Sequence, residues 1–283
     1  MGPGQSIDKL MMDLQQILCE VIYTSILAGD EILEVYQSDF HVEYKGDKSP
    51  LTEADKRSNQ KIIQCLSSYG IPFLTEETDA EVFEERKKWK HLWIVDPLDG
   101  TKEFVKRNGE FTVNVALVEN ERPILGVIYS PVFKDLYYAA KGIGSFKSER
   151  HDVIEFINNG KGDMNSLFRK SLRLPLALEK NKYTVVASRS HLSSETYHHL
   201  EKLKSIKGEV ELINSGSSLK ICLVAEGTAD EYPRFGPTME WDTAAGQAIV
   251  EMAGGKLINL ENHHPLTYNR EVLTNPSFIV YTN

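Results

Sequence analysis

The sequence predicts a protein of mixed α and β structure, with an antiparallel sheet in its first part and alternating helices and strands in its second. Three observations lead to this prediction. Apolar residues three or four apart open the chain, residues 111–139 alternate between apolar and polar side chains, and the pattern changes repeatedly between strand and helix beyond residue 183.

The first predicted element is a long helix over about residues 10–35, because its apolar residues fall mostly three or four apart. A second helix begins near Thr52, a favourable N-cap, and stops at Gly70. Short strands follow at residues 72–75 and 91–95, and acidic residues come directly after each. We therefore expect carboxylates at the carboxyl ends of two strands.

The next stretch predicts a meander of antiparallel strands. Residues 111–117 alternate, residues 119–123 have the composition of a turn, and residues 125–129 and 136–139 alternate again. Sequential strands that are joined by turns pair in antiparallel fashion.

Between residues 141 and 182 the pattern is weaker, and glycines and mixed charges accumulate. We interpret this segment as a candidate insertion close to a domain boundary, which predicts an N-terminal α+β domain of residues 1–182 and a C-terminal α/β domain of residues 183–283. The later predicted elements are strands at 183–187 and 210–213, helices at 193–203, 217–226 and 241–253, and two closing strands.

Composition excludes several classes of protein. The 283 residues are 41% hydrophobic and 26% charged, as in globular chains, and the net charge of −9 argues against binding to nucleic acid. Three distant cysteines, Cys19, Cys65 and Cys222, fit neither a disulfide framework nor a structural zinc site. No apolar run approaches the roughly 18 residues of a membrane span. We expect a cytoplasmic protein; peripheral association with the inner face of a membrane and the oligomeric state stay open.

The most informative stretch is an acidic turn, Asp96-Pro97-Leu98-Asp99-Gly100-Thr101, which follows an apolar strand. Two carboxylates at a strand's carboxyl end can face one point, and such oxygen ligands suit Mg²⁺. Proline stiffens the turn, while Gly100 lets the backbone approach a bound group. Free N–H groups at the next helix start favour a phosphate, and the Thr101 hydroxyl can orient a water.

Each acidic feature also has an ordinary explanation. An Asp-Pro-x-Asp-Gly string is a common surface turn, and adjacent glutamates such as Glu76 and Glu77 are usually solvated. Asp55 and Asp242 suit the first turn of a helix, where an acid interacts favourably with the helix dipole. The occurrence of all four features in one chain favours a shared site.

Four motifs resemble, in order and spacing, the signatures of the inositol monophosphatase-like, lithium-sensitive phosphatase superfamily. They are residues 48–55 (KSPLTEAD), 76–77 (EE), 96–101 (DPLDGT) and 240–246 (EWDTAAG). A longer match, at residues 216–227 and 232–238, is similar to the bacterial 3'(2'),5'-bisphosphate nucleotidase branch of that superfamily. The resemblance implies a layered α-β-α-β-α sandwich.

The resemblance also implies two or three Mg²⁺ ions with a defined set of ligands. Glu76, Asp96 and the backbone carbonyl of Leu98 would hold one ion, and Asp96, Asp99 and Asp242 would hold a second. Two such ions typically lie about 3.5–4 Å apart, which requires a bridging carboxylate. Asp96 occurs in both ligand sets and is the expected bridge.

The resemblance assigns catalytic roles to four more positions. Asp55 and Thr101 match the pair that orients the attacking water, and Glu77 matches a water-mediated contributor. Gly100 and Thr101 would offer backbone N–H groups to the scissile phosphate. Together with Mg²⁺, these groups predict metal-assisted hydrolysis of a phosphomonoester.

The substrate is inferred from the second half of the chain. In the nucleotidase branch, positions that match His191, Ser217, Lys220 and Arg234 contact the nucleotide and its second phosphate. An Arg and a Lys together suit a phosphate dianion. We therefore expect removal of the 3'-phosphate of adenosine 3',5'-bisphosphate to give AMP. Activity on 3'-phosphoadenosine 5'-phosphosulfate would connect the enzyme to sulfur metabolism, and the family implies inhibition by lithium.

Three alternatives stay open. An inositol or sugar monophosphatase of the same superfamily would not need Lys220 and Arg234 as an anchor. A phosphatase with a nucleophilic aspartate shares the Asp-Gly-Thr ending, but its two aspartates are two residues apart, whereas Asp96 and Asp99 are three apart. A noncatalytic, Mg²⁺-dependent nucleotide-binding module would bind the ligand and release no phosphate.

Overall fold

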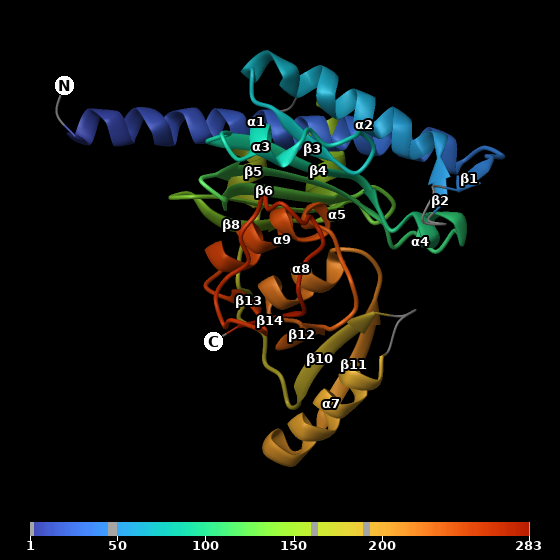
Figure 1. Cartoon of the computed structure of the whole chain (residues 1–283). Coiled ribbons are helices and arrows are strands. Elements are labelled where there is room, and N and C mark those ends of the chain that lie inside the picture. The colour runs from blue at the N-terminus through green and yellow to red at the C-terminus, as the bar shows by residue number, and fades with distance from the viewer. Residues whose placement is uncertain (1–2, 45–49, 160–163, 189–192, 283) are drawn as a thin grey trace.

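The computed structural model describes residues 3–44, 50–159, 164–188 and 193–282. In these residues the chain forms five layers, in the order helices, sheet, helices, sheet and helix, from top to bottom in Figure 1. The predicted α-β-α-β-α sandwich is therefore confirmed.

The first sheet has seven strands in the order β3-β4-β5-β6-β7-β8-β9. Strands β3 and β4 are parallel, and every other neighbouring pair is antiparallel, which confirms the predicted meander. The strands are β3 (Phe73–Thr75), β4 (His91–Asp99), β5 (Thr112–Glu119), β6 (Arg122–Ser130), β7 (Asp135–Ala140), β8 (Gly144–Ser148) and β9 (Leu172–Arg173).

Part of the segment at residues 141–182 belongs to this first sheet, so its interpretation as an insertion is wrong. Strands β8 and β9 extend the sheet beyond β7, and the helices α5 (Arg150–Asn158) and α6 (Met164–Lys170) lie between them in sequence. Gly142, in the turn before β8, and Gly144, the first residue of β8, both take positive φ angles. Glycines in a tight turn and a two-residue strand leave no alternating pattern of apolar and polar residues. The sequence pattern therefore does not predict that the sheet continues beyond β7.

The helices α1 (Pro3–Tyr36), which begins earlier than predicted, and α2 (Glu53–Leu66) cover the outer face of the first sheet, and buried residues of α5 and α6 belong to the same core. The α2 helix is capped by Thr52 and followed by a 3₁₀ turn (Ser67–Tyr69) and Gly70 at φ +63°, as the sequence predicts. Its first turn follows a short antiparallel pair of strands, β1 (Val42–Tyr44) and β2 (Pro50–Thr52).

The helices α8 (Leu219–Glu226) and α9 (Glu240–Met252) fill the layer between the two sheets (Figure 1). Small residues let α9 approach the first sheet closely: a Cβ on Gly126 of β6 would lie 2.4 Å from the carbonyl oxygen of Ala245. This close packing fixes the start of α9, and with it Asp242, relative to the strands.

Successive side chains of β4 point to opposite faces of the sheet, so the strand packs against both neighbouring layers of helices. Trp93 and Val95 pack in the core with α1 and α2, whereas Leu92 and Ile94 pack in the core with α8 and α9. Because helices cover both faces, residues 92–95 of the strand are all apolar, and its carboxyl end is acidic. Two short helices, α3 (Phe83–Arg86) and α4 (Thr101–Val105), flank this strand in sequence.

The second sheet has five strands in the order β11-β10-β12-β14-β13 and mixes parallel and antiparallel pairs. The helix α7 (Ser194–Lys207) covers its outer face, where Leu200 and Leu203 pack against Val185. The strands are β10 (Tyr183–Ser188), β11 (Val210–Ser215), β12 (Glu231–Arg234), β13 (Lys256–Asn259) and β14 (Phe278–Tyr281).

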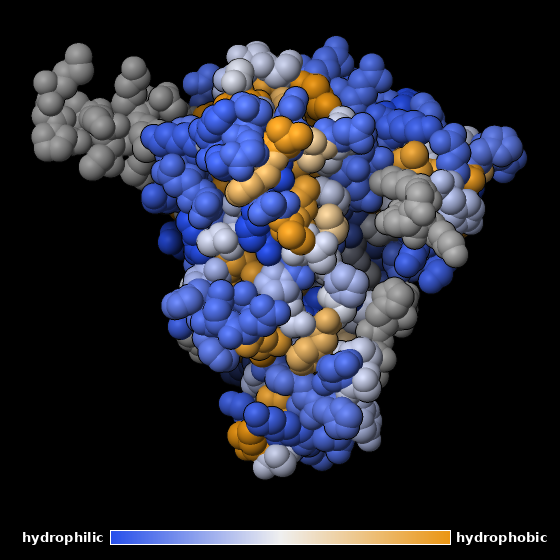
Figure 2. All heavy atoms as spheres, in the orientation of Figure 1, coloured by the Kyte–Doolittle hydropathy of each residue, from blue (hydrophilic) through white to orange (hydrophobic). Residues whose placement is uncertain are grey.

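Among the described residues, no helix combines the length and the apolar character that crossing a membrane requires. Hydrophilic residues predominate on the face seen in Figure 2, and apolar residues are scattered between them.

Candidate active site

The acidic turn is shaped by an irregularity in β4. The pairing of β4 with β5 shifts register between Asp96 and Asp99, and such bulges re-aim side chains. The backbone N–H of Leu98 donates to Asp96 Oδ1 at 3.1 Å, and Gly100 follows with φ +97°, a conformation that favours glycine. The turn thus directs two carboxylates to one end of the strand.

Asp242, in the first turn of α9, completes the arrangement. One carboxylate oxygen each of Asp96, Asp99 and Asp242 lie within 4.8 Å of one another. We call these three residues the central acidic group. They come from two segments more than 140 positions apart, so only the fold brings them together.

Burial and the repulsion of neighbouring acids raise the pKa values of two members of the central acidic group, Asp96 and Asp242. Burial raises the pKa of Asp96 well above its usual value, and the charges of Glu76, Asp99 and Asp242 raise it further. Burial and the charge of Asp99 raise the pKa of Asp242 to about 8, although Arg234 opposes the shift. The strongest electrostatic neighbours of Asp96 are therefore other acids, which leaves negative charge that a cation would neutralise.

The donor set fits Mg²⁺ in its chemistry, because carboxylate oxygens are hard ligands and the excess negative charge is buried. Glu76, which follows β3, lies near enough to raise the pKa of both Asp96 and Asp242. The carbonyl of Leu98, the predicted backbone ligand, lies 3.3 Å from the hydroxyl oxygen of Thr101. The predicted ligands thus gather at one end of β4.

The predicted water-orienting pair is in contact. Thr101 Oγ1 donates to Asp55 Oδ1 at 3.2 Å. The other oxygen of Asp55 accepts from the backbone N–H of Thr52 at 2.7 Å and from its hydroxyl at 2.6 Å, so the capping box of α2 also orients this carboxylate. Burial raises the pKa of Asp55, which is 1% exposed, and the hydrogen bonds from Thr52 oppose that shift.

Glu77 directly follows Glu76 in sequence but lies outside the central acidic group. Its backbone N–H donates to Thr75 Oγ1 at 3.1 Å, and its side chain lines a shallow pocket with Lys56 and Asn59. Its water-mediated role stays a prediction.

Two cations predicted to bind the substrate line a pocket next to the central acidic group. Asp99, Asp242, Ser217, Lys220 and Arg234 all contribute to this pocket. Lys220 is 7% exposed and donates to the carbonyl oxygen of Ser217, and burial lowers its pKa to about 8. The buried Nε of Arg234 has no hydrogen-bond partner among the described residues, and such a donor suits a bound anion.

Two parts of the predicted site lie outside the described residues. His191, a predicted nucleotide contact, falls in the gap at 189–192, and residues 48–49 of the first motif fall in the gap at 45–49.

The sequence did not reveal the residues that hold the acids in place. Ser218 donates to Asp99 Oδ2 through its backbone N–H at 2.6 Å and its hydroxyl at 2.7 Å. Glu240, which is fully buried, accepts hydrogen bonds from the backbone N–H groups of Asn269 at 2.6 Å and Arg270 at 2.9 Å, and so anchors the start of α9. Both residues lie within the recognised motifs, but their partners are distant in sequence.

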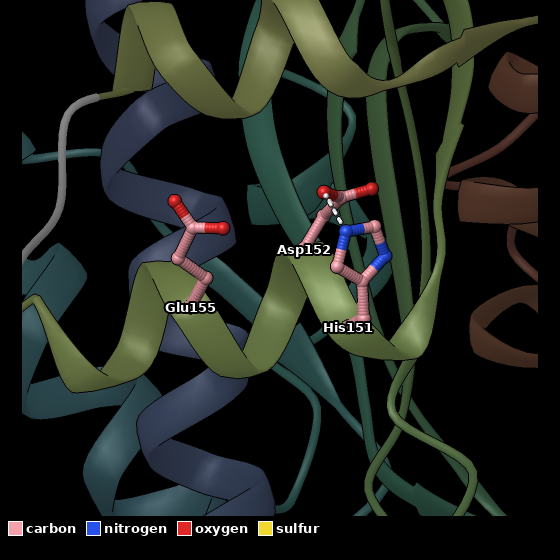
Figure 3. Close-up of side chains that lie close together, drawn as sticks. All are labelled: His151, Asp152 and Glu155. Atoms are coloured by element: carbon pink, nitrogen blue, oxygen red, sulfur yellow. Dashed lines mark ion pairs between the residues drawn. The ribbon is translucent and has the colours of Figure 1, made fainter.

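A second group of possible metal ligands lies on α5, where His151, Asp152 and Glu155 each bring a ligand atom within 4.8 Å of the others (Figure 3). We call these residues the α5 group. His151 Nε2 lies 3.1 Å from Asp152 Oδ1, and Lys170 Nζ donates to Glu155 at 2.6 Å. The His151 side chain is 78% exposed. Glu155 is exposed and pairs with Lys170, whereas Asp152 is buried beside the exposed His151.

The five-layer fold, with acids at the end of β4 and the start of α9, is that of a phosphatase family. The model of the inositol monophosphatase family matches residues 13–280, and the chain belongs to this family, which generally depends on Mg²⁺.

Named relatives are more specific. The chain is 45% identical over 258 residues to the 3'(2'),5'-bisphosphate nucleotidase CysQ of Salmonella typhimurium, and the aligned region covers 89% of this chain and 94% of the relative. It is 43% identical to CysQ of Escherichia coli K12 over the same shares. The crystal structure of CysQ from Bacteroides thetaiotaomicron matches with a TM-score of 0.83 and 46% identity, covering 95% of this chain and 97% of that one. An inositol monophosphatase from Anabaena matches with a TM-score of 0.69 at 22% identity, which shows the fold alone.

Proposed function

We propose that the protein is a 3'(2'),5'-bisphosphate nucleotidase that removes the 3'-phosphate of adenosine 3',5'-bisphosphate to give AMP and phosphate. The observation that carries this proposal is that one pocket is lined both by two acids of the central acidic group, Asp99 and Asp242, and by the cations Lys220 and Arg234. Acids suit the metal-assisted cleavage of one phosphate, and cations suit the binding of another. The relatives named CysQ support the same activity.

Two or three Mg²⁺ ions would be held by the central acidic group, together with Glu76 and the carbonyl of Leu98. Asp96 lies 2% exposed between the other acids and is the proposed bridging ligand. When bound, Mg²⁺ lowers the pKa of water, neutralises charge on the phosphoryl oxygens and stabilises the leaving alkoxide.

Asp55 and Thr101 would orient the attacking water. A hydroxyl that donates a hydrogen bond to a carboxylate keeps its lone pairs free to accept a hydrogen bond from water, and Thr101 donates to Asp55 at 3.2 Å. The raised pKa of the buried Asp55 makes it a better proton acceptor. The N–H groups of Gly100 and Thr101 stay the proposed contacts for the scissile phosphate.

Lys220 and Arg234 would hold the 5'-phosphate, with Ser217 beside them and His191 as a further proposed contact. Burial of the Lys220 cation is unfavourable unless an anion compensates for it, and burial lowers the pKa of this side chain to about 8. The Nε of Arg234, which has no hydrogen-bond partner among the described residues, offers a second donor to such an anion. The same anchor would accept the sulfated phosphate of 3'-phosphoadenosine 5'-phosphosulfate, which would link the enzyme to sulfur metabolism.

We propose a cytoplasmic location, which the three free cysteines, Cys19, Cys65 and Cys222, support.

A substrate panel tests the proposal. Phosphate release is measured from adenosine 3',5'-bisphosphate, adenosine 5'-monophosphate and inositol 1-phosphate, each with Mg²⁺ and with added Li⁺. We expect the bisphosphate to be hydrolysed with by far the highest kcat/KM and Li⁺ to inhibit. Preference for inositol 1-phosphate would favour a monophosphatase, binding without release would favour a noncatalytic module, and a trapped aspartyl-phosphate would favour covalent catalysis.

A further inference from the structure

One oxygen of Asp99 is surrounded by donors from two other segments. Asp99 Oδ2 accepts from the backbone N–H of Ser218 at 2.6 Å, from the Ser218 hydroxyl at 2.7 Å and from the side-chain amide of Asn114 at 3.3 Å. Three donors occupy the capacity of a carboxylate oxygen. Asp99 Oδ1 is therefore the oxygen that a cation would take.

The Ser218 hydroxyl also joins the two ends of the central acidic group. It lies 2.7 Å from Asp99 Oδ2 and 2.8 Å from the backbone carbonyl oxygen of Asp242. Its single proton is shared between these acceptors, while its lone pairs accept from Asn114 Nδ2 at 3.0 Å. Ser218 is 4% exposed, so water does not compete readily for these contacts.

Thr112 sets the orientation of the Asn114 amide. The Thr112 hydroxyl donates to Asn114 Oδ1 at 2.8 Å, which turns the NH₂ end of the amide toward Asp99 and Ser218. Thr112 and Asn114 are two residues apart on β5, so their side chains share one face. Thr112 Oγ1 also lies 3.3 Å from Ser217 Oγ, in the substrate pocket.

We infer that Thr112, Asn114 and Ser218 are positioning residues that fix Asp99 for Mg²⁺ and connect this carboxylate to the turn at Ser217–Ser218. Their exposures of 0%, 1% and 4% and their mutual hydrogen bonds make them one closed network. The inference rests on the proposed function only in that Asp99 binds the metal. It adds a specific cause for the orientation of that ligand.

The expected size of the effect follows from other metal sites. Outer partners of metal ligands typically contribute about 10–100-fold to metal affinity or activity. In Ser218→Ala the backbone N–H remains, whereas the hydroxyl contact to Asp99 and the link to Asp242 are lost. In Thr112→Val the side chain keeps its shape but no longer fixes the Asn114 amide.

The test measures the Mg²⁺ dissociation constant of the full chain by calorimetry without nucleotide, so a wrong substrate assignment does not affect it. We expect Ser218→Ala and Thr112→Val to raise this constant about 10–100-fold. Thr112→Ser, which keeps the hydroxyl, should restore wild-type affinity. Ser130→Ala is the matched control, because Ser130 is fully buried on β6 and its hydroxyl has no partner among the described residues.

Two further readouts separate positioning from general loss of structure. The unfolding temperature in EDTA should stay close to that of Ser130→Ala, and the Mg²⁺ concentration for half-maximal hydrolysis should rise while kcat at saturating Mg²⁺ largely recovers. The inference is overturned if folded Ser218→Ala and Thr112→Val bind Mg²⁺ as tightly as the wild type. It is also overturned if their weaker binding only parallels a lower unfolding temperature.

Discussion

The central acidic group and the α5 group each bring three possible ligand atoms within 4.8 Å of one another, but the first offers only carboxylate oxygens, whereas the second includes the imidazole of His151, and their surroundings also differ. Asp96 is 2% exposed and its strongest electrostatic neighbours are acids. In the α5 group, Lys170 neutralises Glu155 and His151 contacts Asp152 beside open solvent. Proximity of ligand atoms is therefore not what distinguishes a metal site.

This difference indicates that uncompensated buried charge predicts a metal site better than the proximity of possible ligand atoms does. Ionising several carboxylates away from water is costly, and a fold retains such an arrangement where a cation compensates for it. In the α5 group only Asp152 is buried, because His151 and Glu155 are exposed, so this group does not concentrate several buried charges. We expect the two groups to respond oppositely to mutation, metal and pH.

The largest expected effect is on turnover. Asp96→Asn should lower kcat by about a thousandfold or more, because loss of several kcal/mol of charge stabilisation costs tenfold for each 1.4 kcal/mol. The fold should persist, because the amide is isosteric with the carboxylate. Asp152→Asn in the α5 group is the control and should keep nearly full activity. Initial rates with the bisphosphate measure both, and near-normal turnover in a folded Asp96→Asn protein would remove Asp96 from the site.

A smaller effect is expected on substrate affinity. Lys220→Ala and Arg234→Ala should each raise KM for adenosine 3',5'-bisphosphate about 10–100-fold, since a hydrogen bond to a charged group contributes about 1.5–3 kcal/mol. KM for adenosine 3'-monophosphate, which lacks the second phosphate, should change little. Lys170→Ala, beside the α5 group, should leave both values unchanged. Equal losses with the two substrates would exclude a selective role for Lys220 and Arg234.

The smallest expected effect is on stability as a function of pH. The folded-state pKa values of Asp96 and Asp242 are raised above those of unfolded aspartate, about 3.9, with Asp242 at about 8. Their protonated forms therefore favour the folded state at low pH, and this contribution is lost as pH rises through the folded pKa values. In EDTA the unfolding temperature should fall as pH rises toward about 8.

Other buried acids also contribute to that slope, so the difference between proteins is the relevant quantity. Asp242→Asn should flatten the pH dependence in EDTA, and Mg²⁺ should flatten it in the wild type. Glu155→Gln in the α5 group should leave the slope unchanged, because Glu155 has a lowered pKa and is exposed. An identical slope for Asp242→Asn and the wild type would contradict the charge argument.

Local patterns predicted most of the fold. The spacing of apolar residues located α1, and the cap at Thr52 and the glycine at Gly70 bounded the second helix. The strand predicted at residues 91–95 continues to Asp99, however, because Pro97 suggests a strand end and the fold accommodates it at a bulge. Where turns or bulges interrupt periodicity, only tertiary pairing defines the strand.

Those residues of the candidate site that belong to the recognised motifs could be predicted from the sequence. The resemblance named Asp96, Asp99 and Asp242, which the fold brings together, and it named Asp55 and Thr101 as a pair, which the structure shows to be in contact. It did not reveal that Ser218 holds Asp99, because nothing in the sequence links positions 119 residues apart. Hydrogen bonds between segments so distant in sequence form only in the folded chain.

The most direct measurement is anomalous X-ray scattering from a crystal soaked in Mn²⁺, which replaces Mg²⁺ and gives an element-specific signal. We predict a strong anomalous peak in contact with Asp96, Asp99 and Asp242, and no peak beside His151 of the α5 group. Absence of any peak at the three aspartates, in a crystal with well-ordered side chains, would contradict the assignment of the metal site.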